Sequence, residues 1–284
     1  MNQYTIFADS ACDIAPAVLA DWGVPFRSLS FMFDGEETQY SNNELSAAEF
    51  YRQMRGGKTA KTSAVNPDAF YHGFEQELQQ GRDVLYIGFS SGLSTTYNAG
   101  CIAAEELLEK YPDRKILTVD SLAASAGHGL LVYLTLQQKN SGATIEEAAQ
   151  FAKDTSAHLQ QWFTVDTLTY LRKGGRISAT TATLGNMLDL RPILRVDEEG
   201  RLASMSKVRG RKASIRALVD KVKQYAAEDT TIFISHADCE TDAKALAEQI
   251  RQATGHDTTI ITDVGPVIGA HAGPGTLALF FVGK

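Results

Sequence analysis

Apolar positions in the first half of the chain follow two alternating periods. Short apolar runs predict buried strands over residues 4–9, 24–33, 83–89 and 115–120. Longer segments with apolar residues three or four positions apart predict helices over 14–23, 47–56, 67–81, 98–110 and 122–139. Because strands alternate with helices, we expect a mainly parallel sheet flanked by helices on both faces.

The second half of the chain has a different pattern. We predict helices over 144–160, 181–190, 212–227 and 242–253, a hairpin over 191–210, and strands over 230–237, 258–265 and 276–283. One hairpin combined with helix-linked strands is typical of a mixed sheet with helices. The sequence therefore predicts an α/β protein with two domains, residues 1–160 and 161–284. Since no low-complexity linker marks the boundary, the change of pattern alone places it.

Composition and charge narrow the class of protein. The chain has 284 residues, of which 44% are hydrophobic and 9% aromatic, as expected for a globular protein with a full core. A net charge of -7 gives no support for binding nucleic acid or an anionic membrane surface. No signal peptide or membrane span is expected, because no apolar stretch approaches the required length. The three cysteines form no CxxC motif, which favours free thiols and a cytoplasmic location.

Two hydroxyl-rich segments are the main candidates for ligand binding. One is the pair Thr62-Ser63, and the other is the run SSGLSTTY at 90–97, between a predicted strand and a predicted helix. We expect both to be loops. Hydroxyls beside free backbone N–H groups at a helix entrance suit an oxyanion. Because the local sequence supplies no cation, we expect a carboxylate held by hydrogen bonds, and therefore a small acid rather than a polyphosphate.

A catalytic alternative arises within the second segment. Residues 88–92 match the G-x-S-x-G nucleophile elbow, and His236 and His271 follow downstream, as a hydrolase triad requires. A serine hydrolase that uses Ser90 or Ser94 with His271 is therefore an alternative. Against it, too few strands precede Ser90, the next helix starts late, and no HGGG-type loop lies upstream.

Charged residues cluster at strand ends and in one turn. Asp9 ends the first strand, Asp13 follows it, and Asp120 ends a later strand. Helix capping is the simplest role for Asp13 and Asp120, and metal binding by Asp9 and Asp13 is an alternative. Arg172, Lys173 and Arg176 surround the pair Gly174-Gly175. These three basic residues form either a solvated turn or a docking surface for an anionic partner. A nucleotide-phosphate loop is not indicated, because G-x-x-x-x-G-K-[ST] is absent.

A glycine-rich segment near the C-terminus surrounds His271. Residues 265–281 contain glycines at 265, 269, 273 and 275 together with two prolines. We expect an unusual loop there. Because glycine permits close approach of the backbone, a ligand role for His271 is favoured over a histidine bonded only to backbone.

Taken together, these segments resemble the DegV family of fatty-acid-binding proteins over nearly the whole chain. The motifs that carry the resemblance are DSACD at 9–13, TS at 62–63, SSGLSTTY at 90–97, VDSLAASAGHG from 119, YLRKGGRI at 170–177, RPIL at 191–194 and GPVIGAHAGPG at 265–275. The resemblance implies two α/β domains that enclose a long-chain fatty acid, such as palmitate, in an apolar tunnel. It also implies a carrier that presents this acid to a separate fatty acid kinase, without cofactor, metal or catalysis of its own.

The resemblance also assigns residues. Thr62 and Ser94 match the hydroxyls that bind the carboxylate, with Ser63 and Thr95 beside them, and His271 matches the histidine next to the head group. The family's fold is similar to that of dihydroxyacetone kinase, so a carbonyl-compound-binding kinase subunit is a further alternative. This sequence departs from the family pattern at Ala64-Val65-Asn66, at Thr95 in place of glycine, and at Arg191 in place of lysine. The first two departures lie close to the expected carboxylate.

Overall fold

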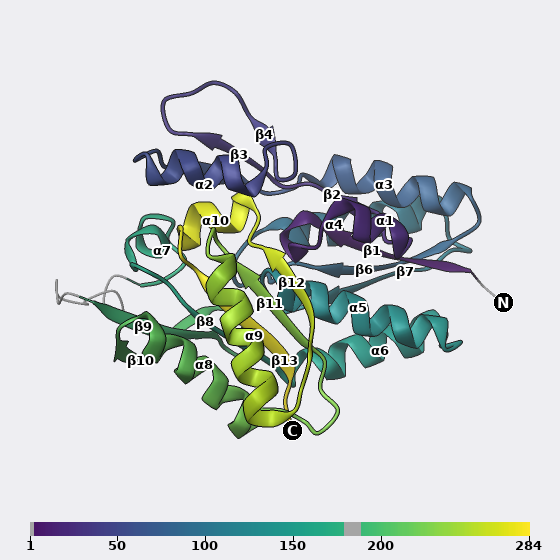
Figure 1. Cartoon of the computed structure of the whole chain (residues 1–284). Helices are drawn as coiled ribbons and strands as arrows, with labels where there is room; N and C mark the ends of the chain where they lie inside the picture. The colour runs from purple at the N-terminus through teal and green to yellow at the C-terminus, as the bar shows by residue number, and fades with distance from the viewer. Residues whose placement is uncertain (1–2, 179–188) are drawn as a thin grey trace.

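Four parallel strands form the first sheet of the computed structural model, which describes residues 3–178 and 189–284. Their order is β2 (Phe26–Arg27), β1 (Tyr4–Asp9), β6 (Asp83–Gly88) and β7 (Ile116–Asp120). Figure 1 shows the helices that cover its two faces, α3 (Pro67–Gln79) with α4 (Thr96–Lys110), and α5 (Ala126–Asn140) with α6 (Ile145–Ser156). The predicted parallel, doubly covered sheet is confirmed.

The second sheet has six strands and is mixed. Its order is β10 (Leu202–Arg209), β9 (Leu190–Val196), β8 (Leu159–Thr164), β13 (Leu277–Val282), β11 (Ile232–His236) and β12 (Thr258–Asp263). Only β11 and β12 pair in parallel, and α8 (Arg211–Tyr225) and α9 (Glu240–Thr254) pack against this sheet. The chain is thus a two-domain α/β protein, as expected. The boundary near residue 160 stays a prediction.

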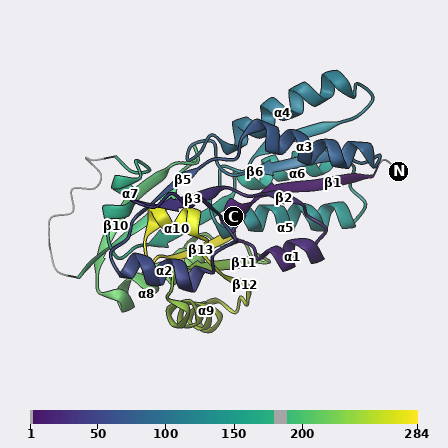
Figure 2. The same cartoon turned by 90° about the horizontal axis from the view of Figure 1, so that it is seen from above.

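A small antiparallel sheet, which the sequence did not predict, completes the fold. It consists of β4 (Tyr40–Ser41), β3 (Ser30–Phe33) and β5 (Ala60–Ser63). The short helix α10 (Pro266–Ala272) packs against β3, β5 and α2 (Ala47–Arg55), so a C-terminal segment lies beside an early one (Figure 2). The remaining short elements are η1 (Ser10–Cys12), α1 (Pro16–Asp21) and α7 (Thr169–Lys173). In the part of the chain that the structure describes, every helix is too short or too polar to cross a bilayer.

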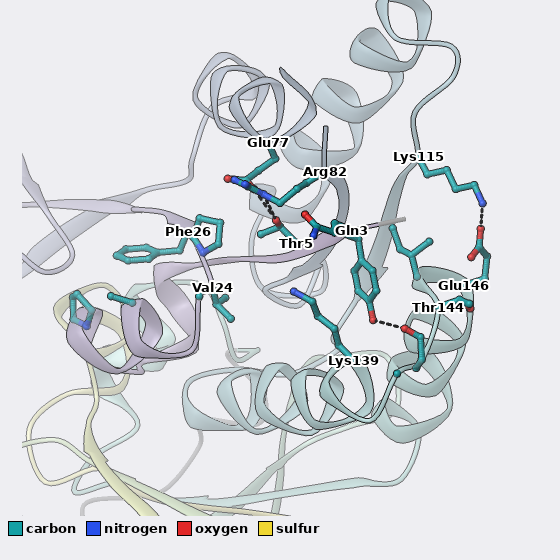
Figure 3. A pocket seen from close by; sticks show the side chains of 18 residues that line it. Gln3, Thr5, Val24, Phe26, Glu77, Arg82, Lys115, Lys139, Thr144 and Glu146 are labelled. Carbon is teal, nitrogen blue, oxygen red and sulfur yellow. Dashed lines mark hydrogen bonds and ion pairs between the residues drawn. The ribbon is translucent and has the colours of Figure 1, made fainter. Parts of the chain in front are cut away.

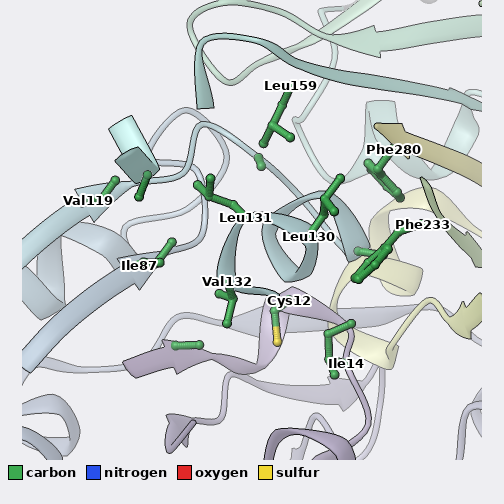
Figure 4. Packing of buried hydrophobic residues seen from close by; sticks show 14 of the residues in the cluster. Cys12, Ile14, Ile87, Val119, Leu130, Leu131, Val132, Leu159, Phe233 and Phe280 are labelled. Atoms are coloured by element: carbon green, nitrogen blue, oxygen red, sulfur yellow. The ribbon is translucent and has the colours of Figure 1, made fainter. Parts of the chain in front are cut away.

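Helix α5 lies between the two larger sheets and joins their cores. It contacts β1 and β6 on one side and β11 and β13 on the other. Its glycines allow this close packing, because a side chain at Gly127 would meet Phe280 at 2.6 Å and one at Gly129 would meet Ile14 at 2.6 Å. Figure 4 shows the resulting cluster, in which side chains of α5 lie between those of the two sheets. A helix that is apolar on all sides fits this position.

Two predicted elements were wrong. The strand expected over 24–33 is two strands in different sheets, β2 beside β1 and β3 beside β5, because the chain turns away at Leu29, whose N–H donates to Ser10 Oγ (3.0 Å). The helix expected over 144–160 ends at Ser156, and β8 begins at Leu159. Two glutamines interrupt the apolar pattern of β8, which concealed a strand buried in the middle of its sheet. The helix predicted over 181–190 falls almost entirely outside the described residues.

Two further segments were expected to be loops and are regular elements instead. Thr62-Ser63 ends strand β5, in which Ala60 and Thr62 are half-buried while Lys61 and Ser63 are exposed. His271 belongs to helix α10, because Pro266 starts a helical turn and Gly273, with φ 83, ends it.

The aspartates at the strand ends hold loops together. Asp9 caps η1 by accepting from Ala11 N, and its other oxygen accepts from Phe89 N and Tyr86 Oη, both at 2.9 Å. Asp13 does not cap α1, whose N-cap is Ala15 without a side-chain hydrogen bond. The predicted cap is therefore wrong for Asp13.

Asp120 also fails to cap a helix, because α5 begins only at Ala126. Its carboxylate accepts from Leu122 N (3.0 Å) and Ser91 N (3.2 Å). It therefore ties the segment after β7 to the segment after β6, at the edge where the ends of parallel strands meet.

Candidate functional site

A cavity of about 490 Å³ lies between the two domains, at the carboxyl edge of the first sheet. It is lined by residues of both halves of the chain. Most of its wall is apolar and includes Leu93, Phe163, Leu171, Val267, Ile268 and Phe280. All five residues assigned to ligand binding from the sequence also line it, namely Thr62, Ser63, Ser94, Thr95 and His271. The volume is within the usual range for small-molecule sites.

Thr62 and His271 are in contact although more than two hundred residues separate them in the sequence. Thr62 Oγ1 and His271 Nε2 are 2.8 Å apart, because α10 packs on the sheet that contains β5. Among the described residues, His271 Nδ1 has no hydrogen-bond partner, and it lies against Gly174, where an added Cβ would approach it to 2.0 Å. Glycine is therefore required at 174 for the ring to occupy this position.

The imidazole of His271 is neutral near pH 7. Burial lowers its pKa to about 4, and the positive charge of Arg176 contributes in the same direction. A neutral ring carries one N–H, and in the described part of the chain only Nε2 has an acceptor, so we assign the proton to Nε2. His271 then donates to Thr62 Oγ1, which leaves the hydroxyl hydrogen of Thr62 free to donate to a ligand in the cavity.

Ser94 is held at the N-terminus of α4. Its Oγ accepts from Thr96 N (3.2 Å) and shares a hydrogen bond with Thr96 Oγ1 (2.9 Å), and Thr96 is fully buried. The neighbouring Thr95 makes no side-chain cap bond. The N-terminal end of this fifteen-residue helix favours negative charge, so the Ser94 hydroxyl lies where an anion is stabilised.

Ser90 has a different environment from Ser94. It is fully buried and does not line the cavity; its Oγ donates to Gly200 O (2.8 Å) in the β9–β10 turn and accepts from Gly92 N (3.2 Å). Gly200 has φ 72, and an added Cβ would approach Ser90 Oγ to 2.1 Å. Ser90 thus joins the two domains. Neither Ser90 nor Ser94 bonds His271, which pairs with Thr62, so the serine–histidine contact that the hydrolase alternative needs is not formed.

Arg176 supplies the cavity with a cation. The sequence had predicted that this residue lies in a solvated turn or on a docking surface. It lines the cavity, and its Nε donates to Leu93 O (3.2 Å). Burial lowers its pKa, and within the described residues it forms no ion pair with a carboxylate. Arg172 and Lys173 are instead exposed, so the three basic residues of this turn divide into two outward and one inward. The position of these residues next to the two glycines does not predict which side chains point outward and which points inward.

A chain of buried hydroxyls forms another part of the cavity wall. Ser125 Oγ donates to Asp13 Oδ2 (2.6 Å) and shares a hydrogen bond with Ser235 Oγ (2.9 Å), and both serines line the cavity. Burial raises the pKa of Asp13 to about 7, although the Ser125 hydrogen bond opposes the shift. These groups come from three distant segments, so no local pattern could have joined them. Their mutual hydrogen bonds let a mainly apolar ligand lie against them.

The chain is similar to known proteins over nearly its whole length. Residues 3–284 match the model of the DegV family, which is described as a family of uncharacterised proteins. A DegV domain-containing protein of Clostridium perfringens is 42% identical over 288 residues, covering 100% of this chain and 98% of its own. Among solved structures, a DegV family protein from Thermus thermophilus, described for its fatty acid binding, has TM-score 0.88 at 25% identity, covering 99% of this chain and 100% of its own.

A third solved structure is similar to this chain in fold. The fatty acid kinase B3 protein of Streptococcus pneumoniae, in a structure loaded with linoleic acid, has TM-score 0.86 and covers 99% of this chain and 100% of its own. Its sequence identity of 23% makes this a likeness of fold alone.

Proposed function

The chain belongs to the DegV family, and we propose that it is a carrier that binds a long-chain fatty acid in the cavity between its domains. One observation supports this function above all. An apolar cavity carries Thr62, Ser94, Arg176 and His271 on its wall. These residues are connected by contact, because Thr62 bonds His271, Gly174 packs against His271, and Arg176 bonds the residue before Ser94. They form the head-group end of the site.

The carboxylate of the acid is bound by several donors at once. A carboxylate is costly to desolvate unless charged or polar donors meet it. The hydroxyls of Thr62 and Ser94 supply such donors, as does the guanidinium of Arg176, which forms no ion pair within the described residues. Neutral His271 orients Thr62. Thr95, which stands where the family pattern has glycine, is exposed at the N-terminus of α4 and forms no side-chain cap bond.

The apolar wall supplies most of the affinity. A palmitate chain has about fourteen methylenes, which contribute roughly 11 kcal/mol if fully buried at about 0.8 kcal/mol each. Ordering and association offset much of this gain. The head-group donors therefore determine the orientation of the acid in the cavity, and the apolar wall determines most of its affinity.

The chain itself catalyses no reaction in this proposal, and works in the cytoplasm. It presents the fatty acid carboxylate to a separate fatty acid kinase, the system to which the Streptococcus pneumoniae relative belongs. Arg172 and Lys173 are exposed beside Arg176, so they are placed to contact an anionic surface near the head-group end. We assign the docking role to these two residues and the cavity role to Arg176.

Thr62→Val keeps the shape of the side chain and removes its hydroxyl. We expect palmitate to bind about ten- to hundredfold more weakly, because one hydrogen bond to a charged acceptor contributes about 1.5–3 kcal/mol. Isothermal titration calorimetry measures the change. Thr62→Ser is the matched control and should bind palmitate nearly as well as the unmodified protein. If the two variants bound palmitate with equal affinity, the Thr62 hydroxyl would not contact the head group.

Reversing the charge of both Arg172 and Lys173 to glutamate tests the docking role. We expect kinase-dependent formation of acyl phosphate to slow by about tenfold or more, with steep salt dependence in the unmodified protein, because exposed charges steer association and are screened by ions. Palmitate binding should stay unchanged. An unaltered rate of acyl phosphate formation would contradict the docking role. A loss of palmitate binding would show that these two residues contribute to the acyl cavity instead.

A further inference from the structure

A second and larger cavity lies at the opposite edge of the first sheet. It has a volume of about 1070 Å³ and shares no lining residue with the acyl cavity. Figure 3 shows it where β1 begins, beside the end of α5 and the start of α6. Nothing in the proposed function uses this space.

Most polar groups around this second cavity are paired with one another. Glu77 accepts from Thr5 Oγ1 (2.6 Å) and from Arg82 Nε (2.7 Å). Lys115 forms an ion pair with Glu146. The phenol of Tyr4 donates to Ala143 O (3.1 Å). Each of these charges or donors is therefore already neutralised or satisfied without a ligand.

Lys139 is the exception among the charged groups that line this cavity. Its ammonium forms no ion pair within residues 3–178 and 189–284, and lies 5.2 Å from the centre of the Tyr4 ring. Figure 3 shows it pointing from α5 into the space in front of Thr5. Burial lowers the pKa of Lys139, repulsion from Arg82 adds to this, and Glu77 opposes it. The lining carries Arg82, Lys115 and Lys139 against Glu77 and Glu146, an excess of one positive charge.

The other side of the cavity is apolar. Residues of α1 and of the segment that leads into β2 supply this surface, namely Pro16, Ala20, Val24, Pro25 and Phe26. A ligand that fits must therefore combine one negative charge with an apolar body. A single ammonium with an adjacent aromatic ring complements a monoanion, whereas a phosphate dianion calls for several donors.

We propose that this cavity is a second ligand site, which binds a small organic carboxylate with an apolar body and uses Lys139 as its cation. The carboxylate supplies the counter-charge that Lys139 lacks, and the apolar body lies against Val24 and Phe26. Because the two cavities share no residue, this site is filled independently of the acyl site.

The fluorescent monoanion 8-anilinonaphthalene-1-sulfonate tests the proposal, with the acyl cavity first saturated with oleic acid. We expect one saturable binding site for the probe. Lys139→Met should weaken probe binding about ten- to hundredfold, because it removes one charged contact. Lys139→Arg should retain binding, because it keeps the cation. Lys153→Met, at an exposed position on α6 that lines neither cavity, is the matched control and should bind as the unmodified protein does.

Competition identifies the chemical class of the ligand. Benzoate should displace the probe, and inorganic phosphate at the same concentration and ionic strength should not. Equal probe affinity for Lys139→Met and the unmodified protein would overturn the proposal, as would the lack of any saturable binding in the oleate-loaded protein. Displacement by phosphate in preference to benzoate would overturn the assignment to a carboxylate. Unchanged oleate binding by each variant verifies that it is folded.

Discussion

Ala278→Phe should abolish detectable binding of palmitate. Ala278 lies on β13 between Ser235 of β11 and Phe163 of β8, and its side chain lines the acyl cavity. A phenyl ring at this position occupies space that the acyl chain needs. If about seven methylenes lose their place, at about 0.8 kcal/mol each, the affinity falls by roughly 5–6 kcal/mol, or more than about a thousandfold. Isothermal titration calorimetry with palmitate measures the loss.

A matched alanine controls for the substitution itself. Ala253 is exposed near the end of α9, so Ala253→Phe should leave palmitate affinity unchanged. Circular dichroism should show the same helix content in both variants. A folded Ala278→Phe protein that bound palmitate as tightly as the unmodified chain would show that the fatty acid does not occupy this cavity.

Arg176→Met should cause the next largest loss, because it removes the cation assigned to the head group while it keeps most of the side-chain volume. Removing one partner of a partly buried charge pair costs about 2–5 kcal/mol, which corresponds to about thirtyfold to several thousandfold weaker palmitate binding. The variant has a second readout. Without the Arg176 charge, the pKa of His271 should rise from about 4 toward its ordinary value, which NMR titration of the ring measures.

Arg172→Met is the control for Arg176, since Arg172 is exposed in the same turn. It should change neither palmitate affinity nor the pKa of His271. If Arg176→Met bound palmitate within about twofold of the unmodified protein, Arg176 would belong with its exposed neighbours rather than with the cavity.

The sequence predicted much of the architecture because most strands and helices of the two larger sheets follow a local periodicity. Parallel strands such as 4–9 and 83–89 are continuous apolar runs between helices, and the structure has them at nearly the same bounds. Strand β8 was missed because its burial comes from its place between β9 and β13, which no local pattern records. The small sheet was missed for a similar reason, since β4 has only two residues.

The candidate site was predicted in part, through the family resemblance rather than through periodicity. The motifs identified Thr62, Ser94 and His271, and the structure brings all three to one cavity. Their local conformations were wrong for Thr62 and His271, which lie on a strand and a helix. The inward direction of Arg176 was not predicted, because the direction of a side chain depends on how the turn packs against Leu93 and not on its spacing from glycines.

Mass spectrometry of an organic extract from the purified protein tests the central claim most directly. The proposed carrier should release close to one equivalent of an intact free fatty acid of about 14–18 carbons, because the bound chain is largely buried and leaves slowly. The denatured protein should show no added acyl mass, since no covalent intermediate forms. An extract without any acyl chain, together with no calorimetric binding of such acids by the delipidated protein, would contradict the account. An acyl-sized increment on the denatured chain would instead support the serine hydrolase.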